Sequence, residues 1–357
     1  MSAHFYPLRV AEIVPETAEA NSIRFEIPSE LREIFAFRAG QHLTLKAEIG
    51  GEEVRRNYSL CTAPDEQDWM VTVKRIPDGI FSNWVGDQLK PGDTLDVMPP
   101  HGSFTTNFDP DRRRRLVGIA GGSGITPVMS LLRTMLKEEP DSSFALFYGN
   151  RDSSSIIFLE ELARLKDRYL DRFELYHFLD QEEGEVELFN GMLDRARCEE
   201  AVEHLVDAPE EIDGWFICGP GPMMDSAESV LVDRGIGRER IHIERFTADR
   251  PPEALIKEMA ELQSKAAGIA MSVTLDGRTR QVQFTEGNIL DSARAAGLPA
   301  PFACKAGVCA TCRAKVVSGK VEMAARYGLT DEEVEDGYVL TCQSVPAADG
   351  VAVDYDA

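Results

Sequence analysis

Four cysteines near the C-terminus constrain this chain most. Three of them share one loop with the spacing C-x4-C-x2-C, and the fourth follows later, as Cys304, Cys309, Cys312 and Cys342. This is the plant-type spacing for a [2Fe–2S] cluster, with three thiolates on a tight loop and the fourth from elsewhere in the fold. The residues around the thiols are small, which lets the loop backbone approach the cluster and point N–H groups at its sulfurs. We therefore predict a [2Fe–2S] site.

Three other uses of these cysteines remain open from the sequence. Zinc is held more often by two C-x2-C pairs or by a mixture of Cys and His, and this loop has one such pair and no nearby His. Buried structural cysteines are common but rarely gather three to a loop. Disulfides are not expected in a chain with seven cysteines, an odd number, and no secretory leader.

The length and charge of the chain limit the number of domains and the kinds of partner that we expect. A chain of 357 residues is long for one core, and we expect about two or three domains. The 61 acidic residues outnumber the 38 basic ones and give a net charge of −23, which disfavours nucleic acid and anionic membranes. Such a charge favours a partner with a basic docking face, or serves solubility alone.

The N-terminus lacks the basic segment and apolar run of a signal peptide. No segment approaches the roughly 18 uninterrupted apolar residues of a membrane span. We therefore expect a cytoplasmic protein, where cysteines stay reduced and available for iron.

Short strands separated by turn residues fill the chain from residue 1 to residue 108. Turns at Gly50-Gly51, Pro64-Asp65, Pro77-Asp78-Gly79 and Pro91-Gly92-Asp93 separate the apolar segments. Regular short strands of this kind predict a closed or nearly closed antiparallel barrel. The expected strands cover residues 41–47, 54–60, 70–75 and 94–98.

One of these strands ends in Arg56-Asn57-Tyr58-Ser59. Strand alternation places Arg56 and Tyr58 on one face and Ser59 on the other. An Arg can hold a pyrophosphate, a Tyr can stack on a flat ring, and a Ser can hydrogen-bond the edge of the ring. Arg and Tyr also alternate on many exposed strands, so this pattern alone is weak.

A second candidate site follows on the same barrel. Val73 and Lys74 end a strand, and Gly79 and Ser82 open a short helix whose free N–H groups and hydroxyl suit a phosphate. Helix capping by Ser82 explains the same residues equally well.

An α/β pattern occupies residues 112–247. It opens with a run of four arginines, residues 112–115, that we expect to be a solvated linker. A buried strand, a loop with Gly122, Gly124 and Thr126, and a helix over residues 127–137 form the first half of a βαβ unit, where phosphates bind helix N-termini. The loop lacks the third glycine of the dinucleotide fingerprint. Alternating strands and helices predict a parallel sheet covered on both faces.

The loops at the carboxyl ends of such strands bind ligands. They carry Arg151 and the sequence Cys218-Gly219-Pro220. Arg151, with Ser153 to Ser155, can grip a 2′-phosphate, which favours NADPH over NADH. A simple surface Arg and a small buried core Cys218 are the alternatives.

The last part of the chain is a linker at residues 248–266, with a polar helix or tether, followed by a compact module at residues 267–357. An Asp276-Gly277 turn predicts a hairpin, and a helix over residues 288–296 precedes the cysteine loop. With strands over residues 314–317 and 351–355, these elements predict a β-grasp fold.

The order of the motifs resembles that of the ferredoxin-NADP reductase superfamily fused to a plant-type ferredoxin, over essentially the whole chain. The resemblance rests on Arg-x-Tyr-Ser, Gly-Gly-Ser-Gly-Ile-Thr-Pro, Cys-Gly-Pro and the cysteine motif. It implies a multidomain fold with a flavin-binding barrel, a nucleotide-binding α/β domain and a [2Fe–2S] ferredoxin domain.

The resemblance also implies roles for single residues. FAD is expected on Arg56, Tyr58 and Ser59, with Ser59 near the flavin N5, while Gly79 and Ser82 bind its pyrophosphate and Val73 and Lys74 adjoin the site. The nicotinamide cofactor is expected on Gly122, Gly124, Thr126, Cys218 and Gly219. Glu244 and Phe246 end the reductase core beside the flavin ring, and Ser59, Cys218, Glu244 and Phe246 form the expected catalytic group.

A reduced nicotinamide gives up two electrons as one hydride, whereas a [2Fe–2S] cluster accepts one at a time. A flavin between them accepts the pair and releases the electrons singly. The resemblance thus implies an oxidoreductase that passes electrons from NAD(P)H through FAD and the cluster to the oxygenase component of a multicomponent monooxygenase. We expect a di-iron oxygenase acting on a CoA thioester. A Rieske ring hydroxylase or a steroid hydroxylase is the alternative partner, and a binding module with structural zinc the alternative of another class.

Overall fold

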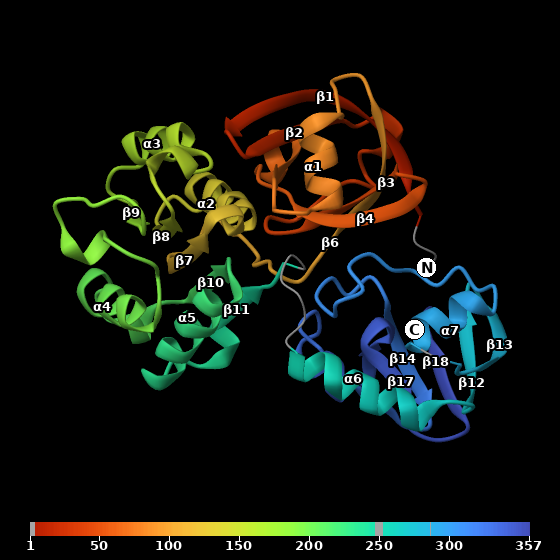
Figure 1. Ribbon diagram of the computed structural model, residues 1–357. Coiled ribbons are helices and arrows are strands. Elements are labelled where there is room, and N and C mark those ends of the chain that lie inside the picture. The colour runs from red at the N-terminus through yellow and green to blue at the C-terminus, as the bar shows by residue number, and fades with distance from the viewer. Residues whose placement is uncertain (1–3, 247–252, 286) are drawn as a thin grey trace. The chain divides into compact units, whose positions relative to one another are not determined.

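A computed structural model describes residues 4–246, 253–285 and 287–357 (Figure 1). The first sheet has six strands in the order β4-β3-β6-β1-β2-β5. The pairs β1–β2, β1–β6, β2–β5 and β3–β6 are antiparallel, which confirms the predicted antiparallel barrel. The strands are β1 (Tyr6–Thr17), β2 (Ala20–Glu26), β3 (His42–Ile49), β4 (Glu52–Ser59), β5 (Trp69–Lys74) and β6 (Thr94–His101).

Inward-facing side chains of these strands form the core of the barrel, among them Leu8, Ile23, Leu45 and Val71, which are fully buried. Helix α1 (Ile80–Asp87) lies against β3 and β5 and buries Phe81 in the same core. The alternation of buried and exposed residues along β1 and β2 was not singled out from the sequence. The long β1 contains two register shifts, and these break its period of two.

The second sheet has five parallel strands in the order β11-β10-β7-β8-β9 (Figure 1). Strand β7 (Arg115–Gly121) is buried at every residue after the first, as expected for a parallel strand covered on both faces. The chain leaves β7 toward β8 on one side and returns to β10 on the other. The carboxyl ends of β7 and β10 therefore form the switch point where such sheets bind ligands. The other strands are β8 (Ser143–Asn150), β9 (Phe173–Leu179), β10 (Gly214–Cys218) and β11 (Ile241–Glu244).

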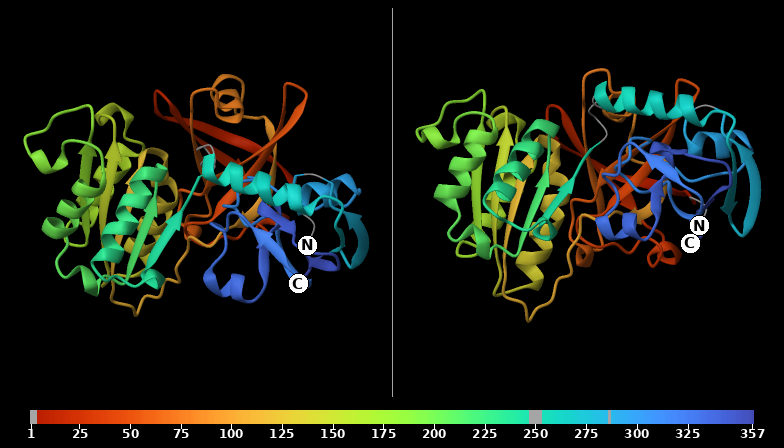
Figure 2. Two further views of the ribbon diagram at one scale, coloured as in Figure 1. Left: turned by 60° about the horizontal axis from the view of Figure 1, so that its bottom comes forward. Right: turned by 90° about the horizontal axis from the view of Figure 1, so that it is seen from below.

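Helices cover both faces of this sheet (Figures 1 and 2). Helices α2 (Ile125–Glu138) and α3 (Leu159–Arg168) lie on one face, and α4 (Arg195–Leu205) and α5 (Gly221–Asp233) pack together on the other. The predicted doubly covered parallel sheet is confirmed.

Only part of the arginine run before β7 is solvated as we expected. Arg112 and Arg113 are exposed, whereas Arg114 belongs to a buried ion pair. The Arg114 guanidinium donates to both carboxylate oxygens of Glu139, at 2.7 and 2.9 Å, and the Glu139 side chain is fully buried. The charge pattern alone could not reveal this pair, because its carboxylate comes from the end of α2.

The C-terminal part of the chain contains a five-stranded sheet in the order β13-β12-β18-β14-β16 and the two-stranded sheet β15–β17. Strand β12 pairs in parallel with β18 and antiparallel with β13, the arrangement of a β-grasp. The elements are α6 (Glu253–Ala266), β12 (Ala270–Leu275), β13 (Arg278–Gln283), α7 (Ile289–Ala295), β14 (Arg313–Ser318), β15 (Val321–Met323), α8 (Asp331–Glu335), β16 (Tyr338–Leu340), β17 (Ser344–Pro346) and β18 (Val351–Asp354).

Helix α6 occupies most of the expected linker. Its residues Met259, Leu262 and Ala266 pack against the core of the C-terminal module. The first residues of that linker, 248–252, lie outside the described residues. The domain boundaries at residues 108, 112, 247 and 267 stay predictions.

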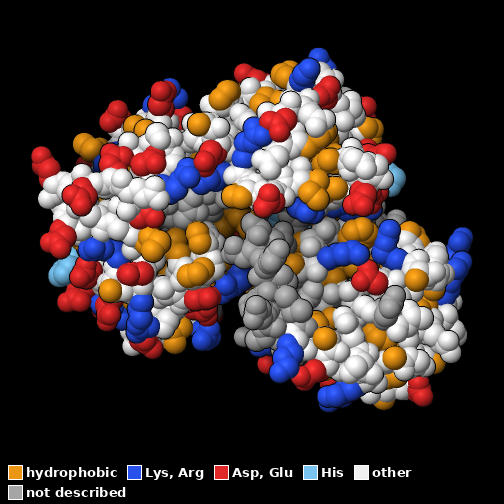
Figure 3. All heavy atoms as spheres, viewed as in Figure 1, with side chains coloured by type: hydrophobic (Ala, Val, Ile, Leu, Met, Phe, Trp, Pro, Cys, Tyr) orange, Lys and Arg blue, Asp and Glu red, His pale blue; other side chains and the backbone are white. Residues whose placement is uncertain are grey.

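The surface mixes charges of both signs, with acidic and basic side chains interspersed over the α/β domain (Figure 3). Within the described ranges, none of the helices combines the length and the apolar character that crossing a membrane requires.

Candidate functional site

Strand β4 presents the expected flavin residues as its alternation predicts. Arg56 is exposed, Tyr58 is half-buried and Ser59 is buried. The Tyr58 ring lies 5.7 Å from the ring of Phe81, which fixes its plane against helix α1. A flat, half-buried ring of this kind provides a stacking surface for an isoalloxazine.

The residues at the start of helix α1 are closely packed. A Cβ on Gly79 would lie 2.4 Å from the Ser82 hydroxyl oxygen, so a larger residue there would have to displace the Ser82 side chain. The Ser82 hydroxyl does not cap the helix; instead it accepts the Ile76 backbone N–H at 3.3 Å. The capping alternative for Ser82 is therefore wrong. The free N–H groups at the start of α1 are compatible with a phosphate.

The glycine-rich loop after β7 meets the loop after β10. A Cβ on Gly124 would lie 2.0 Å from the Cys218 carbonyl oxygen, and one on Gly219 would lie 2.9 Å from the Gly121 nitrogen. The Thr126 hydroxyl donates to the Ser123 carbonyl at 3.1 Å and holds the loop at the start of α2. Gly122, Gly124, Thr126, Cys218 and Gly219 thus lie at one place, the switch point of the sheet.

Ser59, Cys218 and Glu244 meet although they come from distant parts of the chain. The Ser59 hydroxyl donates to Glu244 Oε2 at 3.0 Å, and Cys218 and Glu244 are register partners on neighbouring strands. Burial, and secondarily the Glu244 carboxylate, raise the pKa of the Cys218 thiol well above its usual value. Cys218 is therefore a neutral thiol and not a nucleophile. Phe246 is half-buried two residues after Glu244.

Two basic side chains, Arg151 and Lys74, lie in the same region as the glycine-rich loop after β7. Arg151 pairs with Glu19 at 2.7 Å, and both side chains are more than two-fifths exposed. The Lys74 ammonium would lie 3.5 Å from a Cβ on Gly122. Burial, and then the neighbouring Arg151, lower the pKa of Lys74. Val73 is buried in the barrel core.

The four cysteines of the C-terminal module form two pairs. The Cys304 and Cys309 thiols hydrogen-bond to each other, and so do the thiols of Cys312 and Cys342. Two pairs of sulfurs match a dinuclear cluster, in which each iron takes two protein thiolates. Over the described ranges, no group of three or more His, Cys, Asp or Glu residues is arranged to hold a single metal ion.

Backbone and hydroxyl donors surround the thiols. The Ala306 N–H donates to Cys304 Sγ at 3.3 Å, and the Thr311 hydroxyl hydrogen-bonds to Cys309. Gly307 has a φ of 75°, and a Cβ there would lie 2.9 Å from Gln343 Cγ. The loop therefore requires glycine for both its conformation and its packing.

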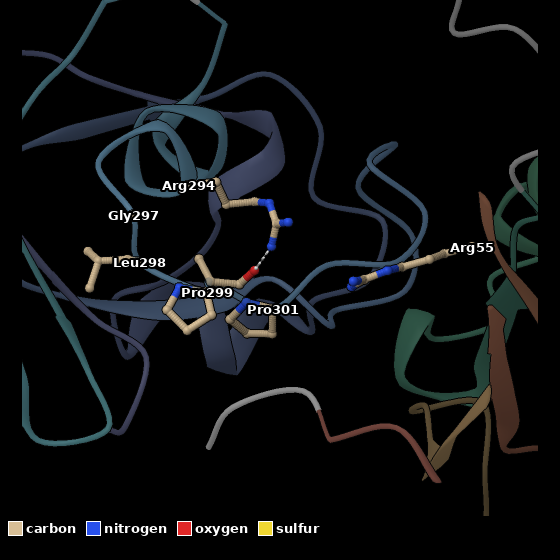
Figure 4. A pocket seen from close by; sticks show the side chains of 7 residues that line it. Arg55, Arg294, Gly297, Leu298, Pro299 and Pro301 are labelled. Carbon is tan, nitrogen blue, oxygen red and sulfur yellow. Dashed lines mark hydrogen bonds between the residues drawn. The ribbon is translucent and has the colours of Figure 1, made fainter. Parts of the chain in front are cut away.

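A chain of buried hydroxyls attaches the fourth cysteine to the loop. The Tyr355 hydroxyl contacts the Thr341 hydroxyl at 2.8 Å, and Thr341 donates to the Cys312 carbonyl at 2.9 Å. Before the loop, Arg294 donates to the Ala300 carbonyl at 3.0 Å and fixes the proline-rich turn (Figure 4). The loop is thus held from both ends by groups outside the cysteine motif.

Three family models match the chain in succession. The oxidoreductase FAD-binding domain matches residues 7–106, the oxidoreductase NAD-binding domain residues 119–229, and the 2Fe-2S iron-sulfur cluster binding domain residues 273–347. One relative, a component of the 1,2-phenylacetyl-CoA epoxidase of Escherichia coli (strain K12), is 41% identical over 99% of this chain and 98% of its own. The chain belongs to the ferredoxin-NADP reductase family, with a ferredoxin domain. It is an oxidoreductase that uses FAD, a nicotinamide cofactor and a [2Fe–2S] cluster, as predicted; the zinc alternative is wrong.

Other relatives support this family assignment. The ferredoxin reductase component of 3-ketosteroid-9-alpha-monooxygenase from Rhodococcus rhodochrous is 37% identical over 98% of this chain and 96% of its own. Among solved structures, phthalate dioxygenase reductase has a TM-score of 0.60 and 22% identity, with 98% of each chain covered. That likeness shows the fold, including the ferredoxin domain.

Sequence reasoning missed three residues near the site. His42, His101 and Glu19 carry no motif, and their sequence neighbours give no signal of a ligand. Only the turn between β1 and β2 and the register of β3 with β6 bring them to the site.

Proposed function

We propose that this chain is the reductase component of a multicomponent oxygenase, with a di-iron oxygenase that acts on phenylacetyl-CoA as the first candidate partner. The observation that carries the proposal is the 41% identity with the 1,2-phenylacetyl-CoA epoxidase component along almost the full length of both chains. The [2Fe–2S] cluster releases one electron at a time, whereas the nicotinamide donates two at once. An electron-transfer sequence that ends in such a cluster suits the delivery of single electrons to an external acceptor.

In this proposal FAD, when bound, accepts two electrons from the nicotinamide and releases them one at a time. Arg56 and Tyr58 hold FAD, and Ser59 hydrogen-bonds the edge of its ring near N5. The helix start at Gly79 and Ser82 binds the pyrophosphate, with Val73 and Lys74 beside it. Ser59, Cys218, Glu244 and Phe246 surround the place of hydride transfer. Cys304, Cys309, Cys312 and Cys342 hold the cluster.

The nicotinamide cofactor binds at Gly122, Gly124, Thr126, Cys218 and Gly219 in the same proposal. The residue that reads the 2′ position of the ribose is Arg151. An exposed ion pair such as Arg151–Glu19 is worth only about 0–1 kcal/mol, so a 2′-phosphate can replace the Glu19 carboxylate. NADPH is therefore the first candidate and NADH the second. Replacing Arg151 by Gln should raise the KM for NADPH about tenfold or more and leave the KM for NADH within about twofold. An equal effect on both would remove Arg151 from this role.

A second partner is supported by the 37% identity with the ferredoxin reductase component of 3-ketosteroid-9-alpha-monooxygenase. The alternative is thus a steroid hydroxylase or a Rieske ring hydroxylase. The proposed place of action is the cytoplasm, where reducing conditions keep the cluster thiols available.

Reconstitution tests the proposal. The purified chain, with NADPH or NADH, is combined in turn with a di-iron phenylacetyl-CoA epoxidase and with a steroid hydroxylase, and product formation is measured. Turnover with the epoxidase alone supports the first partner, and turnover with the hydroxylase alone supports the second. A purified protein without flavin absorbance and without the EPR signal of a reduced [2Fe–2S] cluster would contradict the proposal as a whole.

A further inference from the structure

Two loops meet at the carboxyl ends of β8 and β9, the edge at which a parallel sheet binds ligands. The first loop begins with Arg151 directly after β8, and the second begins with Asp180 directly after β9. The Gln181 N–H donates to the Arg151 carbonyl oxygen at 2.7 Å. The Ser153 N–H donates in the opposite direction, to Glu182 Oε2, at 2.7 Å. The two hydrogen bonds together fix the Glu182 carboxylate beside the segment that carries Arg151.

A carboxylate in this place matters because of the chemistry of the ribose 2′ position. NADPH carries a phosphate there and NADH a hydroxyl group. A carboxylate accepts a hydrogen bond from the hydroxyl group, whereas an arginine accommodates the phosphate. A phosphate monoester carries a charge of about −1.5 to −2 at pH 7, so a neighbouring carboxylate repels it. The two loops contain both kinds of group.

Two other carboxylates near Arg151 are engaged by the protein itself. Asp152 Oδ1 accepts the Ser155 N–H at 3.0 Å and the Ser154 hydroxyl at 2.6 Å, and these bonds shape the loop after β8. Glu19 pairs with the Arg151 guanidinium at 2.7 Å. A cofactor would have to replace one of these contacts before it could use the oxygen that makes it.

Glu182 differs from both, because only one of its two oxygens is used. Oε2 accepts the Ser153 N–H, whereas among the contacts of the described residues Oε1 accepts no hydrogen bond and forms no ion pair. The Glu182 side chain is exposed. Oε1 is therefore available to a hydroxyl group of a ligand. The negative charge of Glu182 remains in the region where Arg151 is proposed to hold a phosphate.

We propose that Glu182 is a specificity-determining residue of the nicotinamide site. Its carboxylate repels a 2′-phosphate and accepts a ribose 2′-hydroxyl group, and it thereby limits the preference for NADPH that Arg151 provides. The inference rests on the proposed function, in which Arg151 reads the 2′ position. Since one charge favours the phosphate and the other disfavours it, Glu182 sets the ratio in which the two cofactors bind.

Calorimetric titration of the oxidised holoprotein tests the inference without electron transfer. The probes are adenosine 2′,5′-bisphosphate, which carries the 2′-phosphate, and 5′-AMP, which carries the 2′-hydroxyl group. Glu182→Gln keeps an acceptor for the Ser153 N–H and removes only the charge. It should lower the Kd of the bisphosphate about fivefold or more and leave the Kd of 5′-AMP within about twofold. The gain should shrink as the salt concentration rises from about 0.05 M to about 0.5 M, because salt screens exposed charges.

Glu185→Gln is the matched control, because it removes the same charge from the same loop. Glu185 is exposed, and among the described contacts it forms no hydrogen bond and no ion pair. This variant should leave the ratio of the two Kd values within about twofold of the original. Steady-state kinetics provide a second readout, in which Glu182→Gln should lower the KM for NADPH about fivefold or more and keep kcat within about twofold.

An unchanged ratio of the two Kd values in Glu182→Gln, or an equal shift in Glu185→Gln, would overturn the inference. Arg151→Gln shows which proposal has failed, since it should weaken binding of the bisphosphate about tenfold or more. If Arg151→Gln has no effect, the proposed reading of the 2′ position is wrong and the inference is wrong with it. Failure of the oxygenase proposal looks different again, because it appears as no turnover with an oxygenase and leaves the titrations unaltered.

Discussion

At the scale of single residues, close packing between backbone atoms explains more of the site at the ends of β7 and β10 than charged side chains do. Gly124 has no special backbone conformation, yet the Cys218 carbonyl oxygen occupies the place of its missing Cβ. The contact brings the carboxyl ends of β7 and β10 together, and this is where the nicotinamide is proposed to bind. A requirement for glycine can thus come from tertiary contact alone.

Replacing Gly124 by Ala should force these two loops apart. Overpacking of this kind costs about 1–3 kcal/mol of unfolding free energy, and the KM for the nicotinamide cofactor should rise. Urea unfolding and steady-state kinetics measure the two effects. The control is Gly184→Ala in an exposed loop, where a Cβ meets its nearest neighbour at an ordinary 3.5 Å. Equal stability of the two variants would contradict the packing argument.

His101 gives the protein a pH-dependent stability. Its pKa is lowered to about 3 in the folded chain, whereas an unfolded chain protonates histidine near pH 6.5. The unfolded state therefore binds more protons between these values, and the unfolding free energy falls as the pH drops below about 6.5. His101→Gln should show a shallower fall between about pH 6.5 and about pH 5 in urea unfolding. A slope identical to that of the unaltered protein, or an equal change in the exposed variant His204→Gln, would contradict this origin.

At the scale of elements, helix α2 joins the two halves of the reductase. Its fully buried Ser130 donates to the Thr62 carbonyl at 2.6 Å and accepts the Gly40 N–H at 3.4 Å. One turn later, Arg133 forms an ion pair with Glu66 at 2.8 Å. The helix that starts at the glycine loop thus also fixes the barrel beside it.

Ser130→Ala should weaken this junction. It leaves a buried carbonyl and a buried N–H without their partner, which costs about 1–3 kcal/mol. Thr134→Val is the matched control, because the Thr134 hydroxyl bonds only back to the Ser130 carbonyl within the same helix, at 2.7 Å, among the contacts described. Thermal unfolding should show the larger decrease for Ser130→Ala. The reverse order would show that the junction does not depend on this hydroxyl.

At the scale of the whole molecule, separate cores support separate steps of electron transfer. The barrel and the C-terminal module each bury their own apolar cluster. The flavin and the [2Fe–2S] cluster are therefore expected to bind independently of each other.

Cys309→Ser tests this modularity. The cluster content, measured by iron, acid-labile sulfide and EPR, should fall strongly because one of the paired thiols is lost. Reduction of ferricyanide at the flavin by the nicotinamide should stay within about twofold, since the reductase core is unaltered. Equal loss of both activities would show that the cluster supports the flavin site.

The sequence alone predicted the three modules and most of their elements. Cysteine spacing, the glycine-rich loop and the change from short strands to alternating strands and helices are local patterns. Such patterns can be recognised in the sequence without knowledge of the fold. The cluster ligands follow from spacing because a loop of fixed length carries three of them. The strands β1 and β2 and the helix α4 were not predicted, since their periodicity is broken or weak.

Tertiary structure decided which distant side chains meet. The hydrogen bond between Ser59 and Glu244 joins residues 185 positions apart. The Arg114–Glu139 pair joins the arginine run before β7 to the C-terminal end of helix α2. The contact of His42 with His101 depends on the register of β3 with β6. Hydrogen-bond direction is set by which donor faces which acceptor across the fold, and no spacing along the chain encodes that. The cysteine motif therefore determined where the cluster binds, and the fold decided which distant side chains meet at the carboxyl ends of the parallel strands.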